Sequence, residues 1–497
     1  MAKAIMVQGT MSNSGKSFIT AGLCRIFSQD GYAVAPFKSQ NMALNSYITE
    51  EGLEIGRAQA MQAFACKIKP SVDMNPILLK PTSNVGSQVI VNGEVVGNMK
   101  AMDYYANKRS FFPAVMEAYR RLDEAYDIIV IEGAGSPAEI NLKADDIVNM
   151  GMAKRAKAPV LLVGDIDRGG VFASLYGTVK LLDDDEQAMI KGMIINKFRG
   201  DVEILRPGLK LIEDKVNLPV VGVVPMEFID IDDEDSLSDR LNQTAVKNGL
   251  DVAVIRLPHI SNFTDFSVFE RLDGISLRYV TGPGRLGKPD LIIIPGTKNT
   301  MDDLAWLRQS GLEGEVLRCH ENKIPVIGIC GGFQMLGEIL EDPFCVEHGG
   351  SMRGMGLLHT KTVFEKAKTR TQICGKVICA HGIFSEAADM EVSGYEIHMG
   401  LTKNLGGCEP MILLSDGRTD ALANEDFSVF GSYLHGLFDD VDFTRALLGK
   451  MMREKGIDGG ESVDFEIYRE QQYDKLASLL RRSIDMDKIY EILNKGV

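Results

Sequence analysis

"MVQGTMSNSGKSF", Met6 to Phe18, decides the fold of the first half of this chain. An apolar run is followed by small and polar residues and by Gly15, Lys16 and Ser17, after which a helical pattern begins. Successive backbone N–H groups that end at a helix N-terminus form a nest for an anion. We therefore expect a phosphate-binding loop, with Lys16 on the outer phosphates and Ser17 as a ligand of Mg²⁺.

Residues around this loop complete a predicted ATP site. The loop is longer than usual, because five residues rather than four separate Gly9 from Gly15. Glu132 ends the predicted strand "DIIVIE", where a carboxylate either holds Mg²⁺ with Ser17 or is simply solvated. Asn196 in "IINKFRGD" either reads an adenine edge or belongs to a plain turn. The predicted ATP-binding residues are Thr10, Asn13, Ser14, Gly15, Lys16, Ser17 and Asn196, and the predicted metal ligands are Ser17 and Glu132.

Short runs of Val, Ile and Leu alternate with helical patterns along the whole chain. In the first half these runs are "AIMVQG", "YAVAPF", "YDIIVIEG", "APVLLVGD", "AMIKGMIIN" and "LPVVGVVP". Strands that are apolar on both faces and separated by helices indicate a parallel sheet covered on both sides. We therefore predict an α/β fold of two domains, each a mostly parallel sheet flanked by helices. The expected bounds are 1–227 for the phosphate-binding domain, 228–250 for an acidic linker, 251–440 for the second domain and 441–497 for a helical C-terminal extension.

Composition narrows the class of protein. The chain has 497 residues, of which 45% are hydrophobic, and a formal net charge of -15, which argues against a general nucleic-acid or membrane-surface binder. It contains no run of about 18 apolar residues, so we expect no membrane span. Eight scattered cysteines form no disulfide framework and fit a reducing cytoplasm. The oligomeric state is not readable from the sequence.

The second half carries a cysteine in the setting of a nucleophile. In "IPVIGICGGFQMLG" a strand leads into Cys330, and Gly328 and Gly331 leave room for a sharp turn into a helix. The helix N-terminus favours the thiolate. The N–H of Gly331 is expected to face an oxyanion, with Gly296 and Thr297 of "PGTKNT" as a second donor.

A cysteine nucleophile needs a base. His435 in "FGSYLHGLF" follows a strand pattern and suits this role, while His398 in "SGYEIHMG" is the competing candidate.

These motifs resemble known families. The lengthened loop and "EGAG" resemble the dethiobiotin synthetase-like branch of P-loop ATPases, and "GICGGFQMLG" with a late histidine resembles class I glutamine amidotransferases. That second resemblance implies Cys330 and His435 as the catalytic pair and Gln334 at the glutamine site.

The His-x-Glu pattern that is usual in class I glutamine amidotransferases is absent here, because Leu437 stands two residues after His435. Glu396, Asp439 or a backbone carbonyl could replace the glutamate. Without one, we expect a loosely held His435.

Together the segments "FKSQNMALNS", "NPILLKPTSNVGSQVIVNG", "GDIDRGGVFAS" and "YLHGLF" resemble the cobyric acid synthase family. This resemblance implies amidation of a corrinoid polycarboxylate with L-glutamine, ATP and Mg²⁺. Cobyrinic acid a,c-diamide synthase is the alternative, and CTP synthetase and a ParA-like partitioning ATPase are remote ones. Since the substrate is anionic, a basic surface should face the phosphates. We predict Lys38 as a catalytic residue, and Gln40, Asn41, Lys80 and Arg168 as substrate-binding residues.

Overall fold

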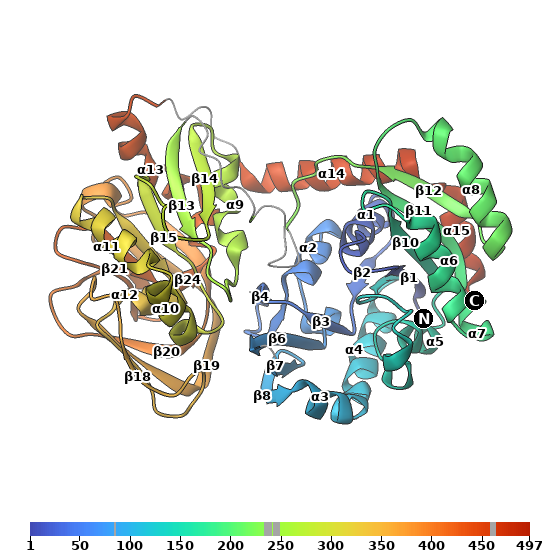
Figure 1. The fold of residues 1–497 in the computed structure, drawn as a ribbon, viewed down its shortest axis with the longest axis horizontal. Coiled ribbons are helices and arrows are strands. Elements are labelled where there is room, and N and C mark those ends of the chain that lie inside the picture. Colours follow the sequence, from blue (N-terminus) through green and yellow to red (C-terminus); the bar gives the residue numbers. More distant parts are fainter. Residues whose placement is uncertain (84–85, 233–240, 242–248, 458–463) are drawn as a thin grey trace.

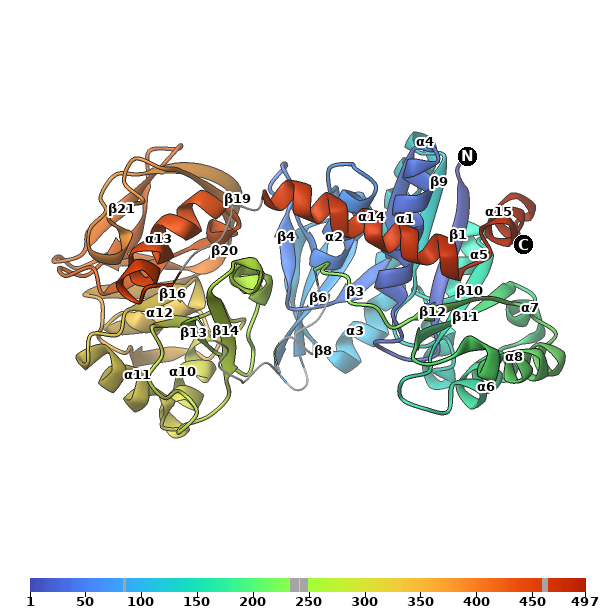
Figure 2. The same cartoon turned by 90° about the horizontal axis from the view of Figure 1, so that it is seen from above.

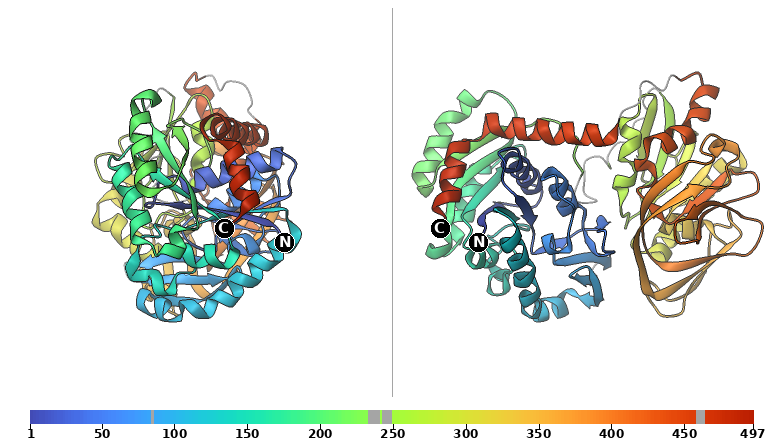
Figure 3. Two further views of the ribbon diagram at one scale, coloured as in Figure 1. Left: turned by 90° about the vertical axis from the view of Figure 1, so that its right-hand side faces the viewer. Right: turned by 180° about the vertical axis from the view of Figure 1, so that it is seen from behind.

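The computed structural model describes residues 1–83, 86–232, 241, 249–457 and 464–497. Two α/β units lie side by side, and a long C-terminal helix reaches from one to the other (Figure 1). Both termini lie on the outer side of the first unit, far from the second (Figure 3). The α/β class that the alternating pattern predicted is thus confirmed.

The first unit is built on a six-stranded sheet with the order β12-β11-β10-β1-β9-β2, and every pairing in it is parallel. Its central strands are buried on both faces, as their continuous apolar sequences require. The strands are β1 (Lys3–Gly9), β2 (Val34–Phe37), β9 (Ile128–Glu132), β10 (Val160–Asp165), β11 (Ile190–Phe198) and β12 (Val220–Pro225). The helices are α1 (Lys16–Gln29), α2 (Arg57–Ala65), α3 (Ala101–Asn107), α4 (Phe112–Ala125), α5 (Met150–Ala156), α6 (Val171–Leu181), α7 (Asp184–Gln187) and α8 (Val202–Val216).

Small strands inserted after β2 face the second unit, and the sequence patterns did not reveal them. One sheet has the order β3-β6-β7-β8, and β4 and β5 form a separate antiparallel pair. In both perpendicular views these strands and α2 lie between the central sheet of the first unit and the second unit (Figures 1 and 2). Their bounds are β3 (Gln40–Met42), β4 (Ser46–Ile48), β5 (Glu54–Gly56), β6 (Ile77–Ser83), β7 (Gly86–Val91) and β8 (Glu94–Lys100).

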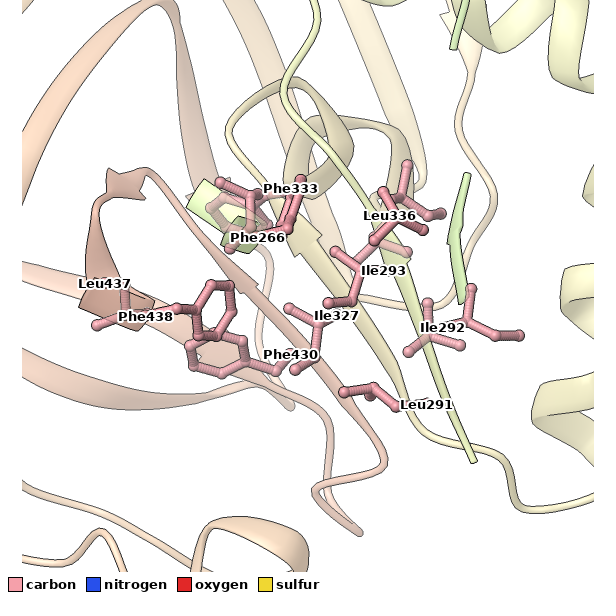
Figure 4. Close-up of a cluster of buried hydrophobic side chains, with 14 of the residues drawn as sticks. Phe266, Leu291, Ile292, Ile293, Ile327, Phe333, Leu336, Phe430, Leu437 and Phe438 are labelled. Carbon is pink, nitrogen blue, oxygen red and sulfur yellow. The ribbon is translucent and has the colours of Figure 1, made fainter. Parts of the chain in front are cut away.

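The second unit has a sheet that is parallel over β14-β13-β15-β16-β23 and continues into mainly antiparallel strands. Phe266, Ile293, Phe430 and their neighbours fill the core between this sheet and its helices (Figure 4). The parallel strands are β13 (Leu250–Ile255), β14 (Ile275–Val280), β15 (Leu291–Ile294), β16 (Val326–Ile329) and β23 (Val429–Ser432). The others are β17 (Ile339–Asp342), β18 (Gly350–Arg353), β19 (Thr360–Val377), β20 (Glu391–Asn404), β21 (Glu409–Leu414), β22 (Thr419–Ala423) and β24 (Leu434–His435), and the helices are α9 (Ser267–Arg271), α10 (Thr300–Gln309), α11 (Leu312–Glu321) and α12 (Gly331–Leu336).

The C-terminal helices belong to the cores of both units. Helix α13 (Val441–Glu454) contributes to the core of the second unit. Helix α14 (Phe465–Ser483) packs on α1 so closely that a Cβ on Gly22 would lie 2.3 Å from Leu480. Helix α15 (Met486–Lys495) contacts β1. The last two helices of the chain therefore pack on the first unit and complete its core. No helix among the described residues is both long and apolar enough to cross a bilayer.

Leu480→Ala tests the packing of α14 on α1. Leu480 is fully buried against α1, so its truncation should lower the free energy of unfolding of the first unit by about 2–5 kcal/mol. Urea unfolding followed by far-UV circular dichroism should show the loss. Fluorescence of Trp306, the single tryptophan of the chain, should change less because it reports the second unit. Ile467→Ala, at a 57% exposed position of α14, is the control and should change stability by about 0.5 kcal/mol at most. Equal effects of the two variants would contradict the packing role of α14.

Candidate active sites

The loop between β1 and α1 is wound as an anion nest. Asn13 and Gly15 have positive φ angles of 59° and 96°, and α1 begins directly after them. Lys16 folds back over the loop, and its Nζ donates to the carbonyl oxygens of Met11 at 3.0 Å and of Gly135 at 3.1 Å. An ammonium held across the mouth of the loop is placed to meet the outer phosphates of a nucleotide.

Polar atoms in the loop fit such a ligand. The hydroxyls of Thr10 and Ser14 are buried and have no partner among the described residues. Asn196 supports the loop, because its Nδ2 donates to the carbonyl of Ser14 at 3.0 Å and sits where a Cβ on Gly15 would be. Asn196 therefore lies at the predicted ATP site, but its side-chain amide nitrogen is hydrogen-bonded to the loop backbone.

Glu132 is the centre of the polar cluster beneath the loop. It is fully buried, and its Oε1 accepts from the Ser17 hydroxyl at 2.9 Å and from Lys38 Nζ at 2.8 Å. Its Oε2 accepts from Gln62 Nε2 at 2.5 Å. A carboxylate and a hydroxyl are ligands that suit Mg²⁺. The two predicted metal ligands, Ser17 and Glu132, are therefore in contact, and Gln62 is a member of the cluster that sequence reasoning missed.

A cavity of ≈ 380 Å³ opens beside the loop. Five of the predicted residues line it together: Asn13, Lys16, Lys38, Gln40 and Asn41. Lys108 and Lys143, which the sequence analysis did not select, also line this cavity, and Lys143 pairs with Glu186 at 2.6 Å.

Two predicted substrate residues do not line this cavity. Arg168 lies in an exposed loop after β10 and faces Asp165 at 3.9 Å. Lys80 is buried and lines a second cavity, one that also includes Cys330 of the second unit. Its Nζ pairs with Glu54 at 2.9 Å. The expectation that Lys38, Lys80 and Arg168 form one basic surface is therefore wrong, because the β6 strand carries Lys80 toward the second unit.

Cys330 stands on a strained elbow between β16 and α12. Its φ of 51° and ψ of −107° are unusual for a residue with a side chain. The two following glycines are required by space, since a Cβ on Gly332 would lie 1.9 Å from the carbonyl oxygen of Ile294 and one on Gly331 would lie 2.7 Å from Thr297. Gly331 is thus packed against Thr297, the other predicted oxyanion residue.

His435 is held by Asp265, which sequence reasoning missed. Nδ1 of His435 lies 2.7 Å from Oδ2 of Asp265, and the Gly436 N–H donates to the other carboxylate oxygen at 3.1 Å. Burial opposes a charged imidazole, but Asp265 and the contact with Cys330 raise the pKa of His435 to about 10. Of the alternatives that the sequence left open, the structure therefore shows a carboxylate supplied from elsewhere in the chain, and His435 is not loosely held.

Neither acidic candidate for the missing glutamate is bonded to His435 among the described residues. Leu437 is fully buried in the apolar core beside Phe438 (Figure 4). Glu396 pairs with Arg418 at 2.5 Å and lies 3.6 Å from His398. The structure records no bond from Asp439 to His435 among its described residues. Asp265 lies 170 positions before His435, so no local motif could have identified it.

The cavity over Cys330 has a volume of ≈ 230 Å³ and is lined by both units. Its walls include His435, Thr297, Gln334 and the competing candidate His398. His398 is stacked on Tyr433 at 3.7 Å, and its Nδ1 faces the carbonyl of Gly400 at 2.8 Å. Gly296 adjoins the site, since a Cβ there would lie 3.0 Å from the His435 ring.

Buried ionisable groups also line the same cavity. Burial and the charge of Lys80 lower the pKa of Lys298 to about 8, and burial raises the pKa of Glu347 to about 7. Burial likewise lowers the pKa of Lys368 to about 7, although Glu54 opposes this. The cavity therefore contains both amino and carboxyl groups as well as the thiol.

Two family models and several curated proteins match this chain. Residues 251–443 match the CobB/CobQ-like glutamine amidotransferase domain, and residues 5–236 match the CobQ/CobB/MinD/ParA nucleotide binding domain. Cobyric acid synthase of Ruminiclostridium cellulolyticum is 56% identical over 100% of this chain and 98% of its own length. That of Lachnoclostridium phytofermentans is 55% identical over the full length of both. This chain belongs to the cobyric acid synthase family.

Family membership confirms the class of enzyme. The chain is a ligase of cobalamin biosynthesis that forms amide C–N bonds and carries a glutamine amidotransferase domain. A nucleotide-binding domain precedes it and implies the use of ATP. Among solved structures, PurLQS of Thermotoga maritima is 20% identical over 40% of this chain and 98% of its own, with a TM-score of 0.33.

Asp265→Asn tests whether the hydrogen bond from Asp265 to His435 is needed for glutamine hydrolysis. An amide can present the wrong hydrogen-bonding atom to Nδ1, so we expect glutamine hydrolysis to fall by up to about 10⁴-fold. Glutamate release measures this loss. Glu396→Gln is the matched control, since Glu396 is also buried but meets Arg418, and it should retain most activity. Equal losses in the two variants would show that Asp265 has no special role.

Proposed function

We propose that this enzyme amidates several side-chain carboxylates of adenosylcobyrinic acid a,c-diamide to give cobyric acid, through acyl phosphates. The observation that supports this most is the presence of two complementary sites in one chain. A carboxylate is a poor electrophile toward ammonia, and phosphorylation by ATP makes it reactive. One unit has a phosphate-binding loop for this activation, and the other has a thiol that can release ammonia from glutamine.

In the second unit, the Cys330 thiolate attacks the amide carbon of glutamine, and a thioester forms as ammonia leaves. The backbone N–H groups near Gly331 and Thr297 stabilise the oxyanion of the tetrahedral intermediate. His435 transfers the proton to the leaving nitrogen. Water then hydrolyses the thioester to glutamate.

Glutamine has an ammonium and a carboxylate at the end away from its amide. Lys298 and Lys368 line the same cavity as Cys330 and can bind the α-carboxylate, while Glu347 can bind the α-ammonium. Lys80 from the first unit lines the same wall. Its proposed role is therefore moved from the corrinoid to glutamine.

In the first unit, Lys16 and the loop N–H groups hold the phosphates of ATP. Mg²⁺ bound by Ser17 and Glu132 would offset negative charge on them. Lys38 contacts Glu132 and lines the adjoining cavity, so its ammonium can bridge the acceptor carboxylate and the transferred phosphoryl group. Gln40 and Asn41 of the same cavity are the proposed contacts for the corrinoid.

The two nitrogen sources separate the roles of the two units. Cys330→Ala should lose glutamine-dependent amidation but keep amidation with ammonium salts at about pH 8–9, where free ammonia is appreciable. Lys16→Ala should lower amidation with either source by about 10²–10³-fold, because the phosphate site serves both. Mass spectrometry of the corrinoid products measures the amides formed. Survival of ammonia-dependent activity in Lys16→Ala would show that the loop is not the ATP site.

Lys298→Met tests glutamine recognition. Removing the proposed partner of the α-carboxylate should raise KM for glutamine and leave ammonia-dependent amidation unchanged. Lys323→Met is the matched control, since the Lys323 side chain is 82% exposed, and its KM should equal that of the unaltered enzyme. An unchanged KM in Lys298→Met would place the α-carboxylate elsewhere.

A further inference from the structure

The cavity beside the phosphate loop contains a buried lysine that the sequence analysis did not select. Lys108 lines this cavity and is only 5% exposed. It begins a short 3-10 helix, Lys108–Phe111, that follows α3. Its Nζ lies 5.7 Å from the centroid of the Tyr105 ring, and it makes no hydrogen bond or ion pair within the part of the chain that the structure describes. An ammonium group in this setting is open to a ligand of opposite charge.

The carboxylates closest in charge to Lys108 are bound to other groups. Asp145 pairs with Arg109 at 2.5 Å. Asp146 accepts from three backbone N–H groups at the N-terminal end of α5, at 2.8 to 2.9 Å. Burial lowers the pKa of the Lys108 ammonium, although the charges of both aspartates oppose this. Because a buried charge costs free energy until it is paired, Lys108 favours an anion that enters the cavity.

The segment that carries Lys108 is packed against β3. The Tyr104 hydroxyl donates to Oε1 of Gln40 at 2.5 Å, and Gln40 lines the same cavity. The Tyr104 ring also stacks on Phe111, with ring centroids 5.9 Å apart. These contacts fix the short helix of Lys108 to the strand that carries a predicted substrate residue.

Large apolar side chains are exposed around the same cavity. Met42 of β3 is 55% exposed, Tyr105 of α3 is 42% exposed, and Leu142 of the 3-10 helix Ile140–Asp145 is 39% exposed. All three line the cavity, although they come from three separate segments. A cluster of exposed apolar side chains commonly marks a binding surface.

Apolar side chains together with ammonium groups suit a ligand with an apolar ring and carboxylates along its edge. The corrinoid acceptor of the proposed function has this chemistry. Lys38 already contacts Glu132 beside the phosphate loop, which is where the reacting carboxylate must lie. Lys108 is a second ammonium on the same cavity, and a polycarboxylate has further carboxylates to offer it.

We propose that Lys108 binds a second, non-reacting carboxylate of the corrinoid while Lys38 contacts the one that is being amidated. Met42, Tyr105 and Leu142 contact the apolar face of the ring. This inference rests on the proposed function, which supplies the polycarboxylate acceptor. No bond is made or broken at Lys108. Two contact points hold the acceptor in one orientation while one of its carboxylates reacts.

Lys108→Met tests this assignment, because methionine keeps an unbranched chain and removes the charge. The full-length enzyme is given saturating ATP and ammonium, so that the thiol site is not needed. KM for the corrinoid should rise by about 10-fold to 100-fold, the loss expected for a hydrogen bond to a charged group. The turnover number at saturating corrinoid and KM for ATP should stay close to those of the unaltered enzyme. Equilibrium dialysis of the corrinoid without ATP should show the same rise in its dissociation constant.

Further variants separate recognition of the corrinoid from general damage. Lys108→Arg keeps a positive charge and should lose less affinity than Lys108→Met. Lys100→Met is the matched control, since Lys100 is exposed at the N-cap of α3 and does not line the cavity. Leu142→Gln should raise KM for the corrinoid by roughly 3-fold to 10-fold through lost apolar contact. Ile140→Gln, at a 55% exposed position of the same 3-10 helix that does not line the cavity, should leave KM unchanged.

An unchanged KM and an unchanged dissociation constant in Lys108→Met would overturn the assignment. An equal rise in KM for ATP would also overturn it, because the whole site would then be damaged. In both cases the unaltered enzyme still forms amides, so the proposed function stands. If the unaltered enzyme forms no amide on the corrinoid with either nitrogen source, the proposed function itself fails.

Discussion

The buried carboxylate of Glu132 is the interaction on which the arrangement of both sites depends. It ends the interior strand β9 and accepts from Ser17 on α1, from Lys38 after β2 and from Gln62 on α2. A fully buried charge is tolerated only when it is paired and hydrogen-bonded, so these three elements are fixed to one point. Helix α2 follows directly on β4 and β5, so the same carboxylate also fixes the end of the inserted segment that faces the second unit.

A second buried carboxylate, Glu54, joins the two units. It lies between Lys80 of the first unit and Lys368 of the second, and these two charges hold its pKa far below the usual range despite burial. Lys80, Thr82 and Asn98 of the first unit also line the cavity over Cys330. The cavity over Cys330 is therefore formed by residues of both units. Under the proposed function, this shared lining gives a structural basis for coupling glutamine hydrolysis to synthesis.

Much of both sites could be predicted because their residues are neighbours in the sequence. The phosphate loop and the Cys330 elbow are set by short runs whose glycines have direct steric causes. Asp265 could not be found in this way, since 170 positions separate it from His435. Lys80 was assigned to the wrong cavity for a related reason, because the small β3-β6-β7-β8 sheet has weak patterns and its direction depends on long-range packing.

The turn after His435 explains why Asp265, and not a glutamate at position 437, holds the imidazole. Strand β24 contains only two residues, and Gly436 then turns the chain with a φ of 75°. Residue 437 consequently enters the apolar core, where leucine is favourable and a carboxylate would be costly. Asp265 supplies the acceptor from the opposite side, and it accepts from the Gly436 N–H as well. One carboxylate thus fixes both the imidazole and the turn that carries it, so the histidine needs no acidic neighbour in its own strand.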